Sequence, residues 1–192
     1  MTLYMIRHGQ TVMNTRGALQ GRSDHPLNEK GKEQAERARR RFEEKGIVFD
    51  RVYTSPLRRA VQTAEILARG ADVITDERLI EMDYGPYEGL DLRSSPPELM
   101  AFFRDLRNTP APEGMEPLPE VTARLGGLLE ELRDERGSIL LSTHAIAMKG
   151  ALEYLTPDSR GGYWSKNIEN CAVYVTHTEA GKYSVPYELF WS

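Results

Sequence analysis

The chain has 192 residues, of which 40% are hydrophobic, and it carries a formal net charge of −4. This length corresponds to about one domain, and the composition is ordinary for a folded globular protein. A single cysteine, Cys171, excludes an intrachain disulfide and a multi-cysteine zinc site, and the acidic balance argues against a globally basic nucleic-acid-binding surface. No apolar run approaches the ~20 residues of a membrane span, and residues 1–9 show no export signal, so we expect a cytoplasmic protein without membrane partners.

The N-terminal half alternates short apolar runs with helical patterns. Residues 3–6 predict a buried strand, and the polar stretch that follows is typical of a loop. Ser55 and Pro56 indicate an N-cap and a first-turn proline, so a helix is expected to start there and to end at Gly70. Around it we expect a helix over about 28–45 and strands over 49–53 and 72–75.

The C-terminal half begins with an irregular segment over 76–97. Residues 109–119 hold four prolines and a glycine, which predicts a loop, and the wider segment at about 86–119 is expected to form a lid. The remaining expected elements are helices over 97–108, 121–132 and 145–154 and strands over 138–142, 172–177 and 183–189. Because strands alternate with helices, we expect one α/β domain over 1–192 with a mostly parallel sheet.

Two histidines follow two of the expected strands. His8 comes directly after the first strand, and His144 comes after the strand over 138–142. Ligands of open parallel sheets bind outside the carboxyl ends of the strands, so the two histidines are in position to share one pocket. Placement alone leaves a packed or surface role equally open.

Cationic side chains surround the first histidine in the sequence. Arg7 carries a permanent charge in a geometry suited to phosphate, and Gly9 lets the backbone approach a ligand closely. Arg59 lies in the first turn of the helix expected after residue 56, where free amide donors also favour an anion. Each arginine taken singly is more often a surface salt-bridge residue. Together, in an acidic chain, they indicate an anionic ligand, most simply phosphate.

Other phosphate chemistries lack their motifs here. No Gly-x4-Gly-Lys-Ser/Thr or Gly-x-Gly-x-x-Gly segment occurs, and no His-Glu-x-x-His or dense Asp/His cluster indicates a metal site. A cysteine phosphatase loop needs an arginine six residues after its cysteine, where this chain has His177. Histidine itself is therefore the candidate nucleophile, and we expect no metal and no cofactor.

Five sequence blocks follow one another across most of the chain: residues 3–11 with Asn14, 20–31, 53–64, 79–89 and 140–144. The first is LYMIRHGQT and the third is YTSPLRRAVQTA. In this order and spacing they resemble the histidine phosphatase superfamily, also called the cofactor-dependent phosphoglycerate mutase-like family. The resemblance implies a three-layer α/β/α sandwich with a mostly parallel central sheet, and it is strongest to the phosphatase branch.

The resemblance also implies roles for the matching residues. His8 is expected to attack phosphorus and form a phosphohistidine, which splits one displacement into two. Arg7, Arg59 and His144 are expected to hold the phosphoryl oxygens. Arg59, and not its neighbour Arg58, occupies the motif position because it directly precedes residue 60.

Glu81 matches the family's proton donor, which protonates the ester oxygen and then activates water. A loop carboxylate paired with an arginine is the alternative interpretation of this position. The family usually has glycine after its second histidine, whereas this chain has Ala145, which keeps the backbone N–H but puts the substrate fit in question. Further phosphate or substrate contacts are expected from Thr11, Asn14, Gln20, Gly21, Tyr84 and Ala145.

Three functions are compatible with such a site. The mutases of this family are usually longer and have an arginine where this chain has Met82, which favours a phosphatase over a mutase. A non-catalytic oxyanion-binding protein is expected to lack His8, Arg59 or Glu81, and all three are present. We therefore expect a metal-independent phosphomonoesterase with a small phosphorylated metabolite as its partner and no nucleic acid. Phosphorylated sugars, sugar acids and nucleoside phosphates all remain open as substrates.

Overall fold

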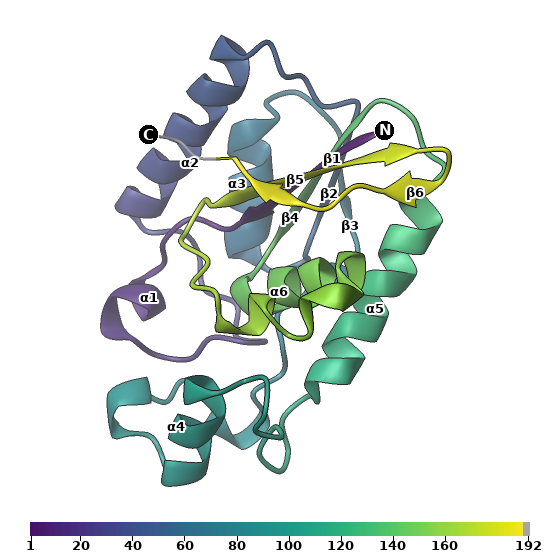
Figure 1. Cartoon of the computed structure of the whole chain (residues 1–192). Helices are drawn as coiled ribbons and strands as arrows, with labels where there is room; N and C mark the ends of the chain where they lie inside the picture. The colour runs from purple at the N-terminus through teal and green to yellow at the C-terminus, as the bar shows by residue number, and fades with distance from the viewer. Residues whose placement is uncertain (190–192) are drawn as a thin grey trace.

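A seven-stranded sheet forms the centre of the computed structural model, which describes residues 1–189 (Figure 1). The strand order is β3-β2-β4-β1-β5-β6, and β7 pairs with β5. The strands are β1 (Thr2–Arg7), β2 (Arg51–Thr54), β3 (Val73–Thr75), β4 (Ser138–Thr143), β5 (Val173–Glu179), β6 (Lys182–Tyr183) and β7 (Tyr187–Glu188). The first four are parallel and the last three pair antiparallel, which confirms the mostly parallel sheet. Residues 190–192 of the expected domain lie outside the described residues.

Helices cover both faces of this sheet (Figure 1). Successive residues of a strand point to opposite faces, so β1 sends Leu3 and Met5 to one core and Tyr4 and Ile6 to the other. The first core includes residues of α5 (Leu118–Leu132) and α6 (Ala145–Leu155), and the second includes residues of α2 (Glu29–Glu44) and α3 (Arg58–Leu67). The two cores produce the expected α/β/α layering. None of the described helices combines the length and apolar character needed to cross a membrane.

Shorter elements occupy the connections. They include two short helices, α1 (Val12–Arg16) and α4 (Pro97–Arg104). Within residues 1–189 there are also five 3₁₀ turns, at Glu77–Leu79, Gly85–Tyr87, Leu92–Ser94, Pro157–Ser159 and Tyr163–Ser165. The helix expected over 97–108 ends at Arg104, because Asp105 leaves helical geometry and its carboxylate accepts from the Asn108 backbone and side chain. The strand expected over 183–189 is interrupted between β6 and β7, a segment that contains Pro186, which has no N–H to donate.

One expectation about a helix start is wrong. The helix after β2 begins at Arg58 with Leu57 as its N-cap, and no side chain caps it. The Ser55 hydroxyl accepts from the Leu57 N–H at 3.3 Å and lies 2.8 Å from Nε2 of His144. Ser55 therefore bonds to His144 and does not cap the helix.

Candidate active site

The register of two parallel strands brings the two histidines together. In the pairing of β1 with β4, Arg7 lies opposite Thr143, and the N–H of His8 donates to the Thr143 carbonyl at 2.9 Å. His8 and His144 therefore leave the sheet side by side, with ring centroids 5.1 Å apart in an edge-to-face arrangement. Both side chains are buried. The two histidines thus lie together at the carboxyl ends of these strands, where ligands of parallel sheets bind.

A hydrogen bond fixes the tautomer of His8, and the surroundings of the ring fix its charge. Its Nδ1 lies 2.7 Å from the carbonyl oxygen of Gly9, which can only accept, so Nδ1 carries the proton. Burial, reinforced by the Arg59 and Arg7 guanidinium groups, holds the pKa of His8 well below its usual range. The ring is therefore neutral at physiological pH, and the lone pair on Nε2 is free to act as a nucleophile.

His144 is held in the opposite tautomer. Nε of Arg59 donates to its Nδ1 at 3.2 Å, so the proton of the neutral ring lies on Nε2 and is donated to Ser55 Oγ at 2.8 Å. Burial and then the Arg59 guanidinium keep the pKa of His144 well below its usual range. Ser55 thus orients the second histidine, a role that only the fold reveals because the two residues are far apart in the sequence.

Backbone carbonyls hold both arginines. Nη1 of Arg59 donates to the Ser23 carbonyl at 2.7 Å, and its Nη2 donates to the carbonyls of Gln20 and Gly21 at 3.2 and 2.8 Å. Nη1 of Arg7 donates to the Ile168 carbonyl at 2.5 Å. Within residues 1–189, neither guanidinium has a carboxylate at ion-pairing distance. Burial lowers the pKa of both groups, and the Glu81 carboxyl partly offsets that effect.

Two residues of this region have buried donors without partners. Nε of Arg7 and Nε2 of Gln20 have no hydrogen-bond acceptor among the described residues. Unpaired buried donors are costly, so an absent acceptor is the simplest explanation. The Thr11 hydroxyl donates to Oε1 of Gln20 at 3.0 Å, which leaves the amide nitrogen of Gln20 for a ligand.

The segment after His8 is ordered by a capping box at the start of α1. The Thr11 hydroxyl accepts from the Asn14 N–H at 3.2 Å, and Oδ1 of Asn14 accepts from the Thr11 N–H at 3.0 Å. Nδ2 of Asn170 donates to the carbonyl of His8 at 2.9 Å and approaches Oδ1 of Asn14 at 3.5 Å. The structure thus places Thr11 and Asn14 near His8, and it adds Asn170, which no sequence pattern indicated.

Gly21 lies where no side chain fits. A Cβ there would be 2.3 Å from the carbonyl oxygen of Met82 and 2.9 Å from Oε2 of Glu88. The Glu88 carboxylate accepts from the N–H of Gly21 at 2.9 Å and from the N–H and hydroxyl of Ser23. Glu88 therefore holds the loop whose carbonyls bind Arg59. It belongs to the fourth sequence block, but its role was not predicted.

Glu81 and Ala145 meet at the start of α6. The buried Glu81 carboxylate accepts from the N–H groups of Met82 and Ala147, each at 2.9 Å, and of Ile146 at 3.2 Å. It is not ion-paired with an arginine among the described residues, contrary to the alternative interpretation. Ala145 is the first residue of α6, with His144 as the N-cap, so its N–H lies at the positive end of the helix.

Tyr84 packs against the 86–119 segment. Its ring is buried and meets Phe103 of α4 edge to face, with centroids 5.8 Å apart. Burial raises the pKa of Tyr84 well above its usual range, so the phenol stays protonated. Arg58 is exposed, in agreement with the choice of Arg59 as the motif position. In the described part of the chain, no group of three or more His, Cys, Asp and Glu side chains has a metal-binding arrangement.

The sequence and fold resemble those of known phosphatases and mutases. Residues 3–187 match the histidine phosphatase superfamily (branch 1). The probable phosphoglycerate mutase GpmB of Escherichia coli is 38% identical over 156 residues, which cover 77% of this chain and 71% of the relative. The solved mycobacterial glucosyl-3-phosphoglycerate phosphatase in complex with VO3 is 26% identical, with a TM-score of 0.84 over 96% of each chain.

A second solved structure extends the comparison. Bacillus stearothermophilus YhfR is 29% identical, with a TM-score of 0.83 over 96% of this chain and 94% of that one. The family match spans nearly all of the described residues and includes every block singled out in the sequence. The chain therefore belongs to the histidine phosphatase superfamily, branch 1.

Proposed function

We propose that the chain is a metal-independent phosphomonoesterase that hydrolyses a small phosphorylated metabolite through a phosphohistidine. One observation carries the proposal: the free Nε2 of His8 lies beside the buried guanidinium of Arg59 and the partly buried side chain of Arg7, and neither arginine has a carboxylate partner among residues 1–189. Buried charge without a counter-ion is costly, so this pocket favours an anion. The phosphoryl group of a monoester supplies that negative charge.

In the first step, the Nε2 lone pair of His8 forms a P–N bond while the bond from phosphorus to the ester oxygen breaks. Glu81 in its protonated form gives its proton to the leaving oxygen. Arg7 and Arg59 stabilise the charge on the phosphoryl oxygens. The neutral ring of His144 completes this wall of the pocket without adding a further charge.

In the second step, water attacks phosphorus and the P–N bond breaks. The Glu81 carboxylate, fixed by three backbone N–H donors, takes the proton from the attacking water. Phosphate leaves, and both the neutral His8 and the protonated Glu81 are restored. The protein's own side chains thus supply the nucleophile, the acid and base, and the charge stabilisation.

The segment at about 86–119 is proposed to act as a lid of this single domain. Phe103 of α4 packs on Tyr84 at the edge of the site. Asp83 and Glu116 exchange hydrogen bonds: the Glu116 N–H donates to the Asp83 carbonyl, and the Asp83 N–H donates to the Glu116 carboxylate. These contacts tie the end of the segment to the strip of chain that carries Glu81.

A phosphoglycerate mutase is the second candidate, supported by the 38% identity with GpmB. Met82 argues against it, because the side chain is fully buried in the core and contributes no charge for a substrate carboxylate. Incubation with 3-phosphoglycerate and its bisphosphate primer distinguishes the two functions. Release of inorganic phosphate supports the phosphatase, and formation of 2-phosphoglycerate supports the mutase.

The test of the phosphatase is hydrolysis of p-nitrophenyl phosphate in the presence of a metal chelator. We expect turnover that the chelator does not reduce and that His8→Ala abolishes. Rapid-quench labelling with a ³²P monoester should trap an acid-labile phosphoenzyme in the wild type only. Failure to trap it under steady turnover, or turnover that survives His8→Ala, contradicts the proposal.

A further inference from the structure

A third cation lies close to the phosphate site. Lys149 of α6 is half-buried, and its Nζ donates to the carbonyl of Trp164 at 3.0 Å. Arg7 donates to the carbonyl of Ile168 in the same loop. Carbonyl groups within residues 164–168 therefore bind both the Arg7 guanidinium and the Lys149 ammonium.

The helix geometry directs Lys149 toward the reaction centre. It lies four residues after Ala145, so the two residues share one face of α6 and are one turn, about 5 Å, apart along the axis. Side chains of a helix lean toward its N-terminus, and the N-terminus of α6 is where Glu81 and His144 lie. Besides burial, both the Glu81 carboxyl and the Arg7 guanidinium influence the pKa of Lys149, so the ammonium lies near these two groups.

The charge of Lys149 is not neutralised by the protein. Among the described residues no carboxylate lies within ion-pairing distance of it, and one of its three N–H groups donates to an acceptor, the Trp164 carbonyl. Burial lowers the pKa of Lys149 to about 8, and the Glu81 carboxyl acts in the opposite direction. At neutral pH the side chain is therefore mostly charged and keeps donors for a further acceptor.

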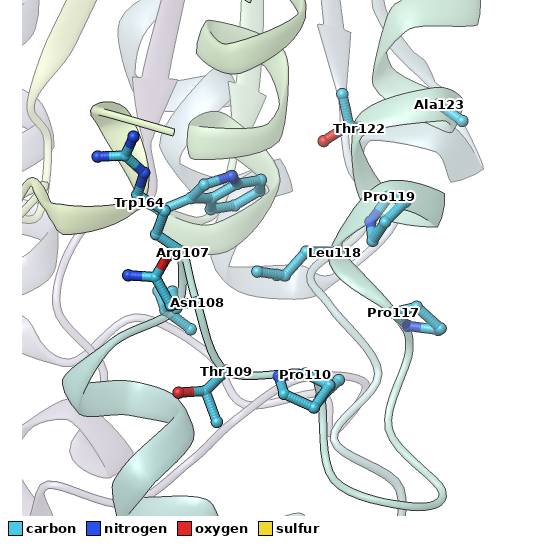
Figure 2. A pocket seen from close by; sticks show the side chains of 12 residues that line it. Arg107, Asn108, Thr109, Pro110, Pro117, Leu118, Pro119, Thr122, Ala123 and Trp164 are labelled. Carbon is cyan, nitrogen blue, oxygen red and sulfur yellow. The ribbon is translucent and has the colours of Figure 1, made fainter. Parts of the chain in front are cut away.

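The residue whose carbonyl binds Lys149 also borders a cavity. The side chain of Trp164, whose carbonyl holds Lys149, lines a cavity of about 730 Å³. Figure 2 shows the indole on one side of this cavity and Pro117 and Pro119 on the other. The cavity also borders residues 106–111, which belong to the proposed lid. Trp164 therefore contacts the Lys149 ammonium through its carbonyl and the cavity beside the proposed lid through its side chain.

We propose that Lys149 is a specificity-determining residue that binds a carboxylate of the substrate while Arg7 and Arg59 bind its phosphoryl group. The substrate class is then the phosphomonoesters of small hydroxy acids. A carboxylate accepts from an ammonium in a charge-assisted hydrogen bond, whereas an uncharged hydroxyl in the same place gains much less. This proposal rests on the phosphatase function proposed above and names the substrate class of that same site.

The test compares 3-phosphoglycerate with glycerol 3-phosphate, which has a hydroxymethyl group in place of the carboxylate. We expect the wild type to prefer 3-phosphoglycerate, and we expect Lys149→Met to reduce the ratio of the two kcat/KM values about tenfold or more. The loss should lie in KM for 3-phosphoglycerate, and Lys149→Arg should restore most of it. Equal losses on both esters indicate a structural role and overturn the proposal.

Lys166→Met is the matched control, because this exposed lysine of the same region stacks over the Tyr163 ring at 5.4 Å. It should leave the substrate ratio within about twofold, since removal of a surface charge has a small effect. If Lys166→Met lowers the ratio of the two kcat/KM values as much as Lys149→Met does, the preference arises from the overall charge of this region, and the proposal is overturned.

A binding measurement separates this inference from the phosphatase proposal. Hydrolysis of p-nitrophenyl phosphate reports the phosphatase function alone. If the wild type hydrolyses none of the three esters, that function fails, and calorimetric titration with 3-phosphoglycerate and glycerol 3-phosphate still decides the role of Lys149. Tighter binding of 3-phosphoglycerate that Lys149→Met removes supports the role, and equal binding of the two ligands refutes it. In an active enzyme, the same titrations use the His8→Ala background.

Discussion

Replacing Glu81 with glutamine separates two roles of this side chain, which are to hold the start of α6 and to exchange a proton with the substrate. Oε1 accepts from the N–H groups of Met82 and Ala147, and Oε2 accepts from that of Ile146. Glutamine has one carbonyl oxygen, so in the place of Oε1 it can still accept from the N–H groups of Met82 and Ala147. Its NH₂ group then faces the Ile146 N–H, donor to donor.

The structural cost of this change is small compared with the catalytic one. One buried N–H loses its acceptor, which destabilises a protein by about 1–3 kcal/mol. For a chain of this size, each kcal/mol lowers Tm by about 2–4 °C. Loss of a general acid lowers the rate by about 10²- to 10⁴-fold when the leaving group is an alkoxide. A nitrophenolate needs no proton to leave. The hydrolysis rate of its ester therefore falls only because Glu81 no longer takes the proton of the attacking water in the second step.

The assay measures kcat for an alkyl monoester and for p-nitrophenyl phosphate, together with inhibition by inorganic phosphate. Glu81→Gln should reduce the alkyl ester rate at least tenfold more than the nitrophenyl rate and leave phosphate inhibition nearly unchanged. Glu116→Gln is the control, because this carboxylate also accepts a backbone N–H, that of Asp83, and binds Arg124. It should affect both esters alike. Equal losses on both esters in Glu81→Gln would refute the acid role.

Two further predictions concern stability. Burial and the Arg59 guanidinium hold the pKa of His8 and His144 below the usual range. Below about pH 6.5 the unfolded chain therefore binds more protons than the folded one. As the pH falls through this range, the free energy of unfolding decreases by up to about 1.4 kcal/mol per pH unit for each imidazole. Urea melts between about pH 7 and 5 should show a shallower decline in His8→Asn than in the wild type, and an identical decline contradicts this account. Gly31→Ala places a Cβ 2.1 Å from a backbone oxygen and should destabilise the fold by about 1–3 kcal/mol or more, whereas Gly127→Ala, with open space in α5, should stabilise it by about 0.5–1 kcal/mol. Thermal melts that rank these two variants the other way would refute the packing argument.

Local patterns predicted the elements whose burial is strong. The apolar run of β1 and that of β4 are long enough to mark buried strands, and both strands end at a histidine. Because parallel strands share an edge of the sheet, this placement put the two histidines in position to share a pocket, but a packed or surface role stayed equally open on placement alone. In contrast, α1 has five residues and no buried side chain, so it produces no apolar periodicity that could reveal it.

Residues whose role depends on distant partners were missed or misassigned. Ser55 precedes a proline and therefore has the local pattern of an N-cap, but its hydroxyl bonds to His144, which lies 89 positions away in the chain. Gly9 was interpreted as an approach point for a ligand. In the fold, a Cβ on Gly9 would lie 2.5 Å from the carbonyl oxygen of Gly31, so the packing of this segment against α2 already requires glycine.

The two arginines of the site keep their positive charge because backbone carbonyls, and not carboxylates, bind them. The carbonyls of Ser23, Gln20 and Gly21 orient Arg59, and the Ile168 carbonyl orients Arg7. A carbonyl dipole fixes a guanidinium without cancelling its charge, whereas a carboxylate would cancel it. Acidic side chains are used elsewhere, as in the pairing of Glu116 with Arg124, so a net charge of −4 is compatible with a cationic pocket. This separation arises from contacts between distant segments, and for that reason composition alone could not reveal it.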